Sequence, residues 1–356
     1  MEEACQHPSG LLLDTAERYG SNLKTALGLG WGETERLTRQ LIEQSTSTAA
    51  RTSLAPEPIV ATKFTPSPWR TSMQSVVDAC EDSRQRIHGP KSDKPIDLYQ
   101  LHMPDIVQPL VRIGQKAQPK DKIYWDGIAE CYHRGLIRNV GVCNYGPTLL
   151  MQCQDHLAKK GVPLASNQIA YSILGRHNGA QATLEKGTEL GIQTLAFFPF
   201  AMGLLTGKYN QPAPSPSQST SGRTSTINSL LSSKRSRMEA NDLYRYALGD
   251  GDTIPKGGIS SLLQVMQDCA DAHDNKTLAQ VALNFIICQG AVPIPGARTR
   301  EQYHDNMGAM GWRLTPDAIS MITEESEKLN FGFEGAGFKR TSESMFWFHF
   351  LIVWTV

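Results

Sequence analysis

The sequence predicts an α/β fold of the (β/α)8 or TIM-barrel class that is incomplete at its N-terminus. Short runs of apolar and β-branched residues alternate along the chain with segments of helical periodicity, which is typical of a parallel sheet. Each run ends at a polar or otherwise distinctive residue, as the carboxyl ends of barrel strands do, and the runs are spaced by about one βα unit with its loops. The 356 residues exceed the roughly 250 that such a barrel needs.

Seven runs are predicted as strands. Each is given with the residue that follows it: Leu11–Leu13 with Asp14, Ile59–Thr62 with Lys63, Ile96–Leu101 with His102, Val140–Cys143 with Asn144, Leu164–Asn167 with Gln168, Ile192–Ala196 with Phe197, and Ala291–Pro295 with Gly296. Helical spacing of apolar residues is clearest over Val76–Ile87, Ile128–Tyr132 and Leu278–Phe285. A doubly wound sheet is the alternative, but no G-x-G-x-x-G sequence follows a predicted strand. The nearest segment, Gly28–Gly32, has the wrong spacing and is interpreted as a loop.

The two ends of the chain depart from a complete barrel. No strand is predicted before Leu11, so the first βα unit is expected to be missing. A barrel without this unit would have open sheet edges with unpaired backbone groups. We therefore expect either a natural protein that is longer at its N-terminus or a poorly stable form. Residues 1–330 are predicted as the barrel domain, with a long surface insertion at 210–256, and residues 331–356 as a tail. The apolar end Met345–Val356 is too short to cross a bilayer, which takes about 20 residues. It is interpreted either as a β-prone segment packed on the body or as a gene-model error.

Composition narrows the partners. The 35 Lys and Arg residues balance 35 Asp and Glu residues, which argues against the basic surface that nucleic-acid and anionic-membrane binders need and favours a small-molecule partner. Seven cysteines without a C-x-x-C pair indicate neither a disulfide framework nor a zinc site, so no metal is predicted. The first ten residues resemble neither a signal peptide nor a transit peptide. A soluble intracellular protein is expected.

Four residues after the first three runs form a chemically coherent set: Asp14, Tyr19, Lys63 and His102. A tyrosine with its ordinary pKa near 10 is a poor acid at neutral pH. A neighbouring lysine stabilises the phenolate, an aspartate holds the lysine, and a histidine can hydrogen-bond the reacting oxygen. Taken singly, each has a structural interpretation, as a helix cap or turn former, an ion-pair partner or a core histidine. Together and in this order they predict protonation of a carbonyl oxygen as hydride reaches its carbon.

The sequence resembles the aldo-keto reductase family over roughly residues 4–330. The segments that carry the resemblance are DTAERYG at Asp14–Gly20, ATKF at Ala61–Phe64, DLYQLHMPD at Asp97–Asp105, GVCNY at Gly141–Tyr145, SNQIAYS at Ser166–Ser172, FFPFAMGLLTGKY at Phe197–Tyr209 and PIPGARTREQYHDNMGAMGW at Pro293–Trp312. Within the family, the chain is more similar to the plastid and cyanobacterial oxidoreductases and the potassium-channel β-subunits than to the aldose reductases.

The resemblance implies an (α/β)8 barrel that binds NADPH and reduces an aldehyde or ketone, with Tyr19 as general acid, Lys63 and Asp14 tuning it, and His102 orienting the carbonyl. It implies that Asn144 and Gln168 bind the nicotinamide carboxamide. The implied cofactor contacts are Cys143, Asn144, Gln168, Phe197, Phe198, Pro199, Phe200, Lys208, Gly296, Arg298, Gln302, Asp305 and Asn306. Phe197 would stack on the nicotinamide, Lys208 would reach the pyrophosphate, and Arg298 would supply the charge that a 2′-phosphate requires.

Two departures from the family pattern concern the cofactor. Cys143 stands where the family usually has a serine, and a thiol is a weaker hydrogen-bonding partner. Phe198 and Phe200 fall within a segment that usually reads Y-S-P-L, so a serine contact to the pyrophosphate is lost. Two alternatives stay open. The resemblance permits an NADPH-binding redox-sensing regulatory subunit with little turnover, and the missing first strand permits a truncated inactive relic. It also allows either cytoplasm or plastid as the compartment.

Overall fold

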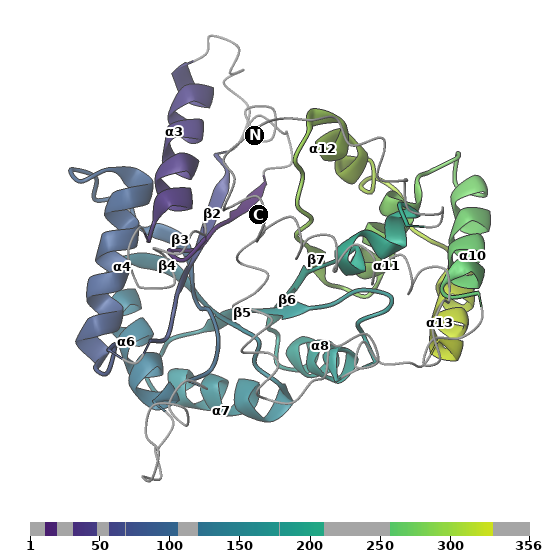
Figure 1. Ribbon diagram of the computed structural model, residues 1–356. Helices are drawn as coiled ribbons and strands as arrows, with labels where there is room; N and C mark the ends of the chain where they lie inside the picture. Colours follow the sequence, from purple (N-terminus) through teal and green to yellow (C-terminus); the bar gives the residue numbers. More distant parts are fainter. Residues whose placement is uncertain are drawn as a thin grey trace, which may run out of the picture. The chain divides into compact units, whose positions relative to one another are not determined.

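The structure is a computed structural model that describes residues 11–19, 31–47, 57–67, 69–105, 120–177, 179–209 and 257–329 (Figure 1). Several predicted features lie outside the described residues: the N-terminal residues 1–10, most of the glycine loop Gly28–Gly32, the insertion 210–256 and the tail 331–356. Among the described residues, no helix is both long enough and apolar enough to cross a membrane.

Seven strands lie in the described part of the chain, and their order in the sheet is their order in the sequence. They are β1 (Leu12–Asp14), β2 (Ile59–Phe64), β3 (Ile96–Leu101), β4 (Ile137–Cys143), β5 (Leu164–Ala170), β6 (Gln193–Phe197) and β7 (Val292–Pro293). Each neighbouring pair from β1 to β5 is parallel. The seven predicted runs are thus confirmed, and the fold is that of an incomplete (β/α)8 barrel. Strand β7 is short because Pro293 and Pro295 have no N–H for a ladder bond.

The chain divides into two compact units. Of the described residues, the first unit holds those up to Ile169 together with Ala182–Leu195, and the second holds Ala170–Gln181, apart from residue 178, and those from Ala196 to Leu329. The described helices of the first unit are α3 (Glu33–Ser47), α4 (Met73–His88), α6 (Asp121–His133), α7 (Pro147–Ala158) and most of α8 (Ala180–Glu189). The second unit holds the 3-10 helix η1 (Ala201–Thr206) and helices α10 (Ser260–Asp271), α11 (Leu278–Cys288), α12 (Arg300–Met307) and α13 (Pro316–Lys328).

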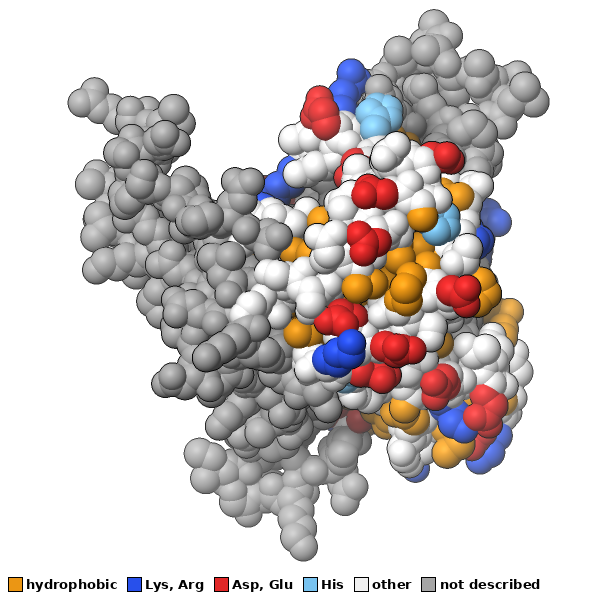
Figure 2. Space-filling model, turned by 90° about the vertical axis from the view of Figure 1, so that its right-hand side faces the viewer, with side chains coloured by type: hydrophobic (Ala, Val, Ile, Leu, Met, Phe, Trp, Pro, Cys, Tyr) orange, Lys and Arg blue, Asp and Glu red, His pale blue; other side chains and the backbone are white. Residues whose placement is uncertain are grey.

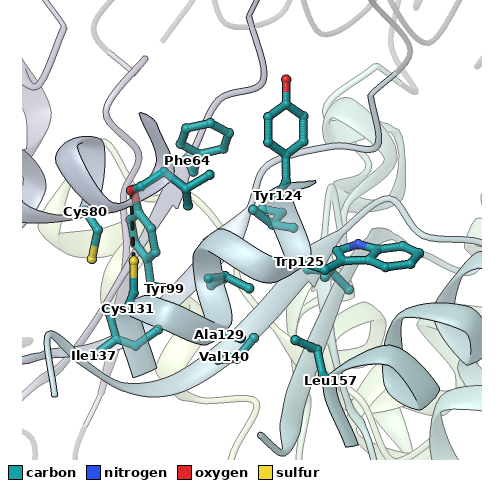
Figure 3. Close-up of a cluster of buried hydrophobic side chains, with 14 of the residues drawn as sticks. Phe64, Cys80, Tyr99, Tyr124, Trp125, Ala129, Cys131, Ile137, Val140 and Leu157 are labelled. Carbon is teal, nitrogen blue, oxygen red and sulfur yellow. Dashed lines mark hydrogen bonds between the residues drawn. The ribbon is translucent and has the colours of Figure 1, made fainter. Parts of the chain in front are cut away.

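In the first unit, helices α4, α6 and α7 pack on one face of β2, β3 and β4 (Figure 1). The core between these layers is built from large side chains such as Phe64, Tyr99, Tyr124 and Trp125 (Figure 3). Strand β2 is buried on both faces after its first residue, as parallel strands are. Because side chains alternate along a strand, Thr62 bonds Glu35 of α3 while Lys63 points to the opposite face, where the candidate site lies.

Gly127 is required by the close approach of α6 to α4. A Cβ atom at this position would lie 2.6 Å from the Cβ of Val76 and 3.0 Å from the carbonyl oxygen of Met73. Alanine is the better helix former by up to about 1 kcal/mol, but overpacking costs roughly 1–3 kcal/mol. We therefore expect Gly127→Ala to lower the free energy of unfolding by about 1–2 kcal/mol, measured by urea denaturation.

Gly187 in α8 is the matched control for that substitution. Its Cβ would lie 3.2 Å from the nearest atom, the carbonyl oxygen of Ile192, so small shifts can accommodate a methyl group. Gly187→Ala should therefore cost less than Gly127→Ala. An unfolding midpoint for Gly127→Ala at or above that of the unmodified protein would contradict the assigned helix contact.

In the second unit, α10 packs against α11 and α13 around a core that includes Leu262, Met266, Phe285 and Ile322. The face on which α10 and α13 lie shows acidic side chains scattered around patches of hydrophobic ones (Figure 2). The same unit contains the carboxyl ends of three strands. Tyr171 N donates to Phe197 O at 3.1 Å, and Ile294 N donates to Ala196 O at 2.9 Å. These bonds place the residues that follow β5, β6 and β7 next to one another.

Candidate active site

Lys63 is the centre of the site in the first unit. Its side chain is fully buried, and its Nζ donates to Asp14 Oδ2 at 2.6 Å, to Thr15 O at 2.9 Å and to Tyr19 OH at 3.1 Å. An ammonium group has three N–H donors, so these three bonds use them all. Burial lowers the pKa of Lys63, but the electrostatic effects of Asp14 and Tyr19 together are larger. The net result is a pKa above the ordinary value of 10.5. Lys63 is therefore a fixed cation.

Tyr19 lies in the loop after β1, five residues beyond Asp14. Because its hydroxyl oxygen accepts from Lys63, its own hydrogen remains available to a different acceptor. Burial raises the pKa of Tyr19 to about 12, against the lowering effect of Lys63. The sequence predicts that the lysine lowers this pKa, but the effect of burial is larger, so the net shift of the pKa is upward. The tyrosine is consequently protonated at neutral pH.

Asp14, the last residue of β1, receives three donors. Besides Lys63, Gln168 Nε2 donates to Asp14 Oδ1 at 3.0 Å and Gln100 Nε2 donates to the same oxygen at 3.4 Å. The sequence analysis assigns Gln168 to cofactor binding, and the structure shows that its amide also supports Asp14. Gln100, fully buried on β3, was not singled out from the sequence. Its spacing of two from His102 is the signal that places both side chains on one face of the strand.

His102 follows β3 and is fixed by its backbone and its ring. His102 N donates to Phe64 O at 2.8 Å, and Asn144 Nδ2 donates to His102 O at 3.2 Å. The imidazole meets the Tyr19 ring edge-on, with centroids 5.7 Å apart and an angle of 75° between the planes. The structure thus brings together all four side chains that the sequence analysis groups: Asp14, Tyr19, Lys63 and His102.

Cys143 ends β4 beside this cluster, and Asn144 follows it. Cys143 is buried, and its Sγ donates to Gln100 Oε1 at 3.7 Å. Burial also raises the pKa of its thiol well above the ordinary value. Cys143 is therefore a neutral thiol with a partner inside the first unit. Asn144 is half-buried and adopts a φ of 63°, a left-handed conformation that asparagine tolerates better than most residues.

A network at the rim of the site was missed by the sequence analysis. Arg70 Nη2 donates to Glu17 Oε2 at 3.0 Å, and Thr65 N donates to Glu17 Oε1 at 2.6 Å. The Arg70 guanidinium also lies 4.7 Å from the centre of the Trp31 ring and 4.8 Å from that of Phe64, distances typical of cation–π contacts. Glu17 and Arg70 are 53 positions apart, so no local pattern could have paired them.

The second unit contains the other predicted cofactor residues. Phe197 is the last residue of β6, and Phe198 follows it. Their ring centroids lie 4.9 Å apart, and Phe198 has a φ of 56°. Pro199 comes next, and Phe200 packs partly on the core of this unit. Lys208 Nζ lies 5.3 Å from the centre of the Tyr209 ring. The charge of Arg298 acts on the Tyr209 hydroxyl, whose pKa burial raises.

Arg298 precedes the first turn of α12, and the positive end of a helix dipole favours anions. Thr299 caps this helix by accepting from Gln302 N at 3.2 Å, and Arg298 N donates to Gln302 Oε1 at 2.7 Å. Asn306 Nδ2 donates to Gly296 O at 3.4 Å. A Cβ atom at Gly296 would meet nothing within 4 Å. The helix start therefore combines a positive side chain with open space beside the backbone.

Asp305 lies on the same helix but its groups are partly engaged elsewhere in the unit. Thr277 Oγ1 donates to Asp305 Oδ1 at 2.8 Å, and Gln280 Nε2 donates to Asp305 O at 3.0 Å. These bonds tie α12 to the start of α11, whose capping box is formed by Thr277 and Gln280. Asp305 thus supports the position of α12, and its predicted contact with the cofactor stays a prediction.

The buried cluster of Asp14, Tyr19 and Lys63 lies at the carboxyl ends of parallel strands, and comparisons with known proteins identify the family. The profile of the aldo/keto reductase family matches residues 7–327. The pyridoxal reductase of Arabidopsis thaliana, described as chloroplastic, is 32% identical over 320 residues, which are 89% of this chain and 74% of that protein. An aldo-keto reductase of Strobilurus tenacellus is 27% identical and covers 89% of this chain and 81% of its own length.

A solved structure supports the fold. The crystal structure of an aldo-keto reductase in complex with NADPH has a TM-score of 0.56 to this chain, at 17% identity, and the match covers 88% of this chain and 73% of that one. The chain belongs to the aldo/keto reductase family of oxidoreductases.

Proposed function

We propose that the chain is an NADPH-dependent reductase that converts an aldehyde or ketone to an alcohol, with Tyr19 as the general acid. The observation that carries this proposal is the set of three hydrogen bonds made by Lys63, one of which ends on the Tyr19 hydroxyl oxygen at 3.1 Å. A general acid must hold a proton at neutral pH and must release it to the substrate. The high pKa of Tyr19 meets the first requirement, and the neighbouring cation of Lys63 serves the second.

The residues of the chain have separate parts in this reaction. Tyr19 donates its proton to the carbonyl oxygen as negative charge develops there. Lys63 stabilises the resulting phenolate, Asp14 keeps Lys63 charged, and His102 orients the carbonyl by a hydrogen bond. When bound, NADPH supplies the hydride for the carbonyl carbon. The step adds one hydride and one proton to the carbonyl group, so the product is an alcohol.

Each unit, taken by itself, carries side chains that suit part of a phosphorylated nicotinamide cofactor. Arg298 and the start of α12 offer a cation and backbone donors to a phosphate, and Gly296 leaves open space. Asn144 and Gln168 carry the amide groups that a carboxamide needs, and Phe197 is a half-exposed aromatic ring. We assign Cys143, Asn144, Gln168 and Phe197–Phe200 to the nicotinamide and pyrophosphate end. Lys208 is assigned to the pyrophosphate, and Gly296, Arg298, Gln302, Asp305 and Asn306 to the adenosine end.

The test of the proposed function is turnover by the purified full chain. The relative named pyridoxal reductase makes pyridoxal a first substrate to try, together with p-nitrobenzaldehyde as a generic aldehyde. Oxidation of NADPH that depends on added aldehyde supports the proposal. Tight binding of NADPH without turnover would instead support the redox-sensing regulatory subunit, and binding of neither NADPH nor NADH would refute both.

Arg298→Ala is expected to reduce the preference for NADPH over NADH. A hydrogen bond to a charged group contributes about 1.5–3 kcal/mol, so the Kd for NADPH should rise by roughly 10- to 100-fold, while the Kd for NADH should change little. Fluorescence titration with both cofactors measures the two constants. Arg313→Ala, at another exposed arginine of the second unit, is the control. Equal weakening of both cofactors by Arg298→Ala would contradict the assigned phosphate contact.

A further inference from the structure

We propose that Thr65 is a positioning residue that sets the hydrogen-bonding state of His102: its hydroxyl donates to Nδ1 and thereby keeps the ring proton on Nε2. The inference rests on the proposed carbonyl reduction and adds a residue to its machinery. Thr65 Oγ1 lies 3.4 Å from His102 Nδ1. Thr65 follows β2, two residues beyond Lys63, so the alternation of the strand directs both side chains to the same face.

The direction of this hydrogen bond follows from burial. Thr65 is fully buried, and a buried hydroxyl hydrogen needs an acceptor. Among the described residues, the structure gives Thr65 Oγ1 one hydrogen-bond partner, His102 Nδ1. If Nδ1 carried a hydrogen, two donors would face each other or the hydroxyl hydrogen would lack a partner. The lone pair of a neutral ring on Nδ1 satisfies Thr65 and leaves the hydrogen on Nε2.

The backbone of Thr65 is held as firmly as its side chain. Thr65 N donates to Glu17 Oε1 at 2.6 Å, and Thr65 O accepts from Arg70 Nη1 at 3.1 Å. Ser67 Oγ also donates to Thr65 O, at 3.2 Å. The Glu17–Arg70 ion pair, almost buried on the glutamate side, therefore fixes the place from which Thr65 reaches His102. The Glu17–Arg70 ion pair thus holds the backbone of Thr65 in position.

The chemical consequence concerns the substrate oxygen. A ring with its hydrogen on Nε2 can donate to a carbonyl oxygen, whereas a ring with its hydrogen on Nδ1 offers that oxygen only a lone pair. Such a repulsive contact would oppose binding of the carbonyl in the orientation that Tyr19 protonates. The rings of His102 and Tyr19 pack edge-on, so a move of the hydrogen on the His102 ring also changes the surroundings of Tyr19, the general acid.

The test uses Thr65→Val, which keeps the shape and removes the hydroxyl, and Thr65→Ser, which keeps the hydroxyl. For Thr65→Val we expect kcat for p-nitrobenzaldehyde to fall by about 2- to 13-fold, the effect of one lost hydrogen bond, with the Kd for NADPH unchanged. Thr65→Ser should recover most of the activity. Thr62→Val is the matched control, because the buried hydroxyl of Thr62 bonds Glu35, on the opposite face of β2 from Lys63.

A second readout reports the ring directly and does not depend on turnover. Nitrogen-15 NMR of labelled protein distinguishes the two neutral ring forms, and His102→Gln identifies the signal of this one among nine histidines. The proposal expects the Nε2–H form in the unmodified protein and in Thr65→Ser, and a growing share of the Nδ1–H form in Thr65→Val. An unmodified protein with the Nδ1–H form, or a Thr65→Val protein with unchanged ring signals and unchanged kcat, would overturn it. If no variant and no unmodified protein turns over aldehyde, the proposed function fails, and the NMR result still decides the role of Thr65.

Discussion

Replacing Tyr19 by phenylalanine is expected to lower kcat for carbonyl reduction by roughly 10²- to 10⁴-fold, the usual contribution of a general acid. The ring remains, so its edge-on contact with His102 is kept, and only the hydroxyl is lost. Lys63 then has two acceptors, Asp14 and the carbonyl of Thr15, instead of three. Steady-state kinetics with p-nitrobenzaldehyde measure the loss, and fluorescence titration should give an unchanged Kd for NADPH.

The pH dependence of the unmodified protein tests the same role. Because burial raises the pKa of Tyr19 to about 12, the acid stays protonated through neutral and moderately alkaline solution. The rate of reduction should therefore show no loss from ionisation of Tyr19 below roughly pH 11. A Tyr19→Phe protein that keeps kcat within about twofold of the unmodified value would remove Tyr19 from the mechanism.

Asp14→Asn is expected to produce the largest loss of stability. It leaves the ammonium of Lys63, which is fully buried, without a counter-charge. Removing one partner of a buried ion pair costs about 3–5 kcal/mol. Urea denaturation at neutral pH measures this loss. Activity should fall as well, since an uncompensated lysine tends to lose its proton and then no longer stabilises the phenolate of Tyr19.

The response to pH separates this explanation from a general packing defect. In the unmodified protein the pKa of Lys63 is raised above 10.5, so the stability from the pair is fully present below pH 10.5 and is lost as pH rises through the raised pKa. In Asp14→Asn, burial acts on Lys63 alone and should lower its pKa below 10.5. The unfolded chain then binds more protons than the folded one, so the stability of this variant should rise between about pH 7 and pH 10.

A double variant tests whether the loss of stability comes from the unpaired charge of Lys63. Asp14→Asn with Lys63→Met removes both charges, and a buried ion pair can often be replaced by uncharged groups at little cost in stability. The double variant should therefore recover stability relative to Asp14→Asn but remain inactive. A flat pH dependence for Asp14→Asn, together with no recovery in the double variant, would contradict the role assigned to the pair.

The strands that carry the site could be predicted because chemically distinctive residues lie at their carboxyl ends. Buried parallel strands appear in the sequence as short apolar runs, and six of the seven runs here are followed by a polar or aromatic residue, the seventh by Gly296. Since the carboxyl ends of parallel strands meet at one edge of a sheet, Lys63 and His102 could be placed together without a structure. Helix α3 was not predicted: its sequence is mostly polar, and its anchoring residue, Glu35, is a buried carboxylate that pairs with Arg86 and Thr62.

Other features required the three-dimensional arrangement. The direction of the pKa shift of Tyr19 depends on how deeply the hydroxyl is buried, and a motif carries no information about depth. The Glu17–Arg70 pair joins residues from two distant loops, so no spacing in the sequence reveals it. Thr65 and Gln100 could have been found, because each lies two positions from a residue already singled out, Lys63 and His102 respectively. The assignments of the cofactor residues came from the family resemblance, since their types and spacing alone are common in proteins.

The most direct test of the account is the fate of the transferred hydrogen. We would incubate the purified chain with p-nitrobenzaldehyde and NADPH that carries deuterium at the transferable position, and analyse the products by mass spectrometry. The account predicts one molecule of alcohol for each NADPH oxidised, with the deuterium on the carbon that was the carbonyl carbon. Oxidation of NADPH without the deuterated alcohol, or no oxidation by a chain that binds NADPH, would contradict it.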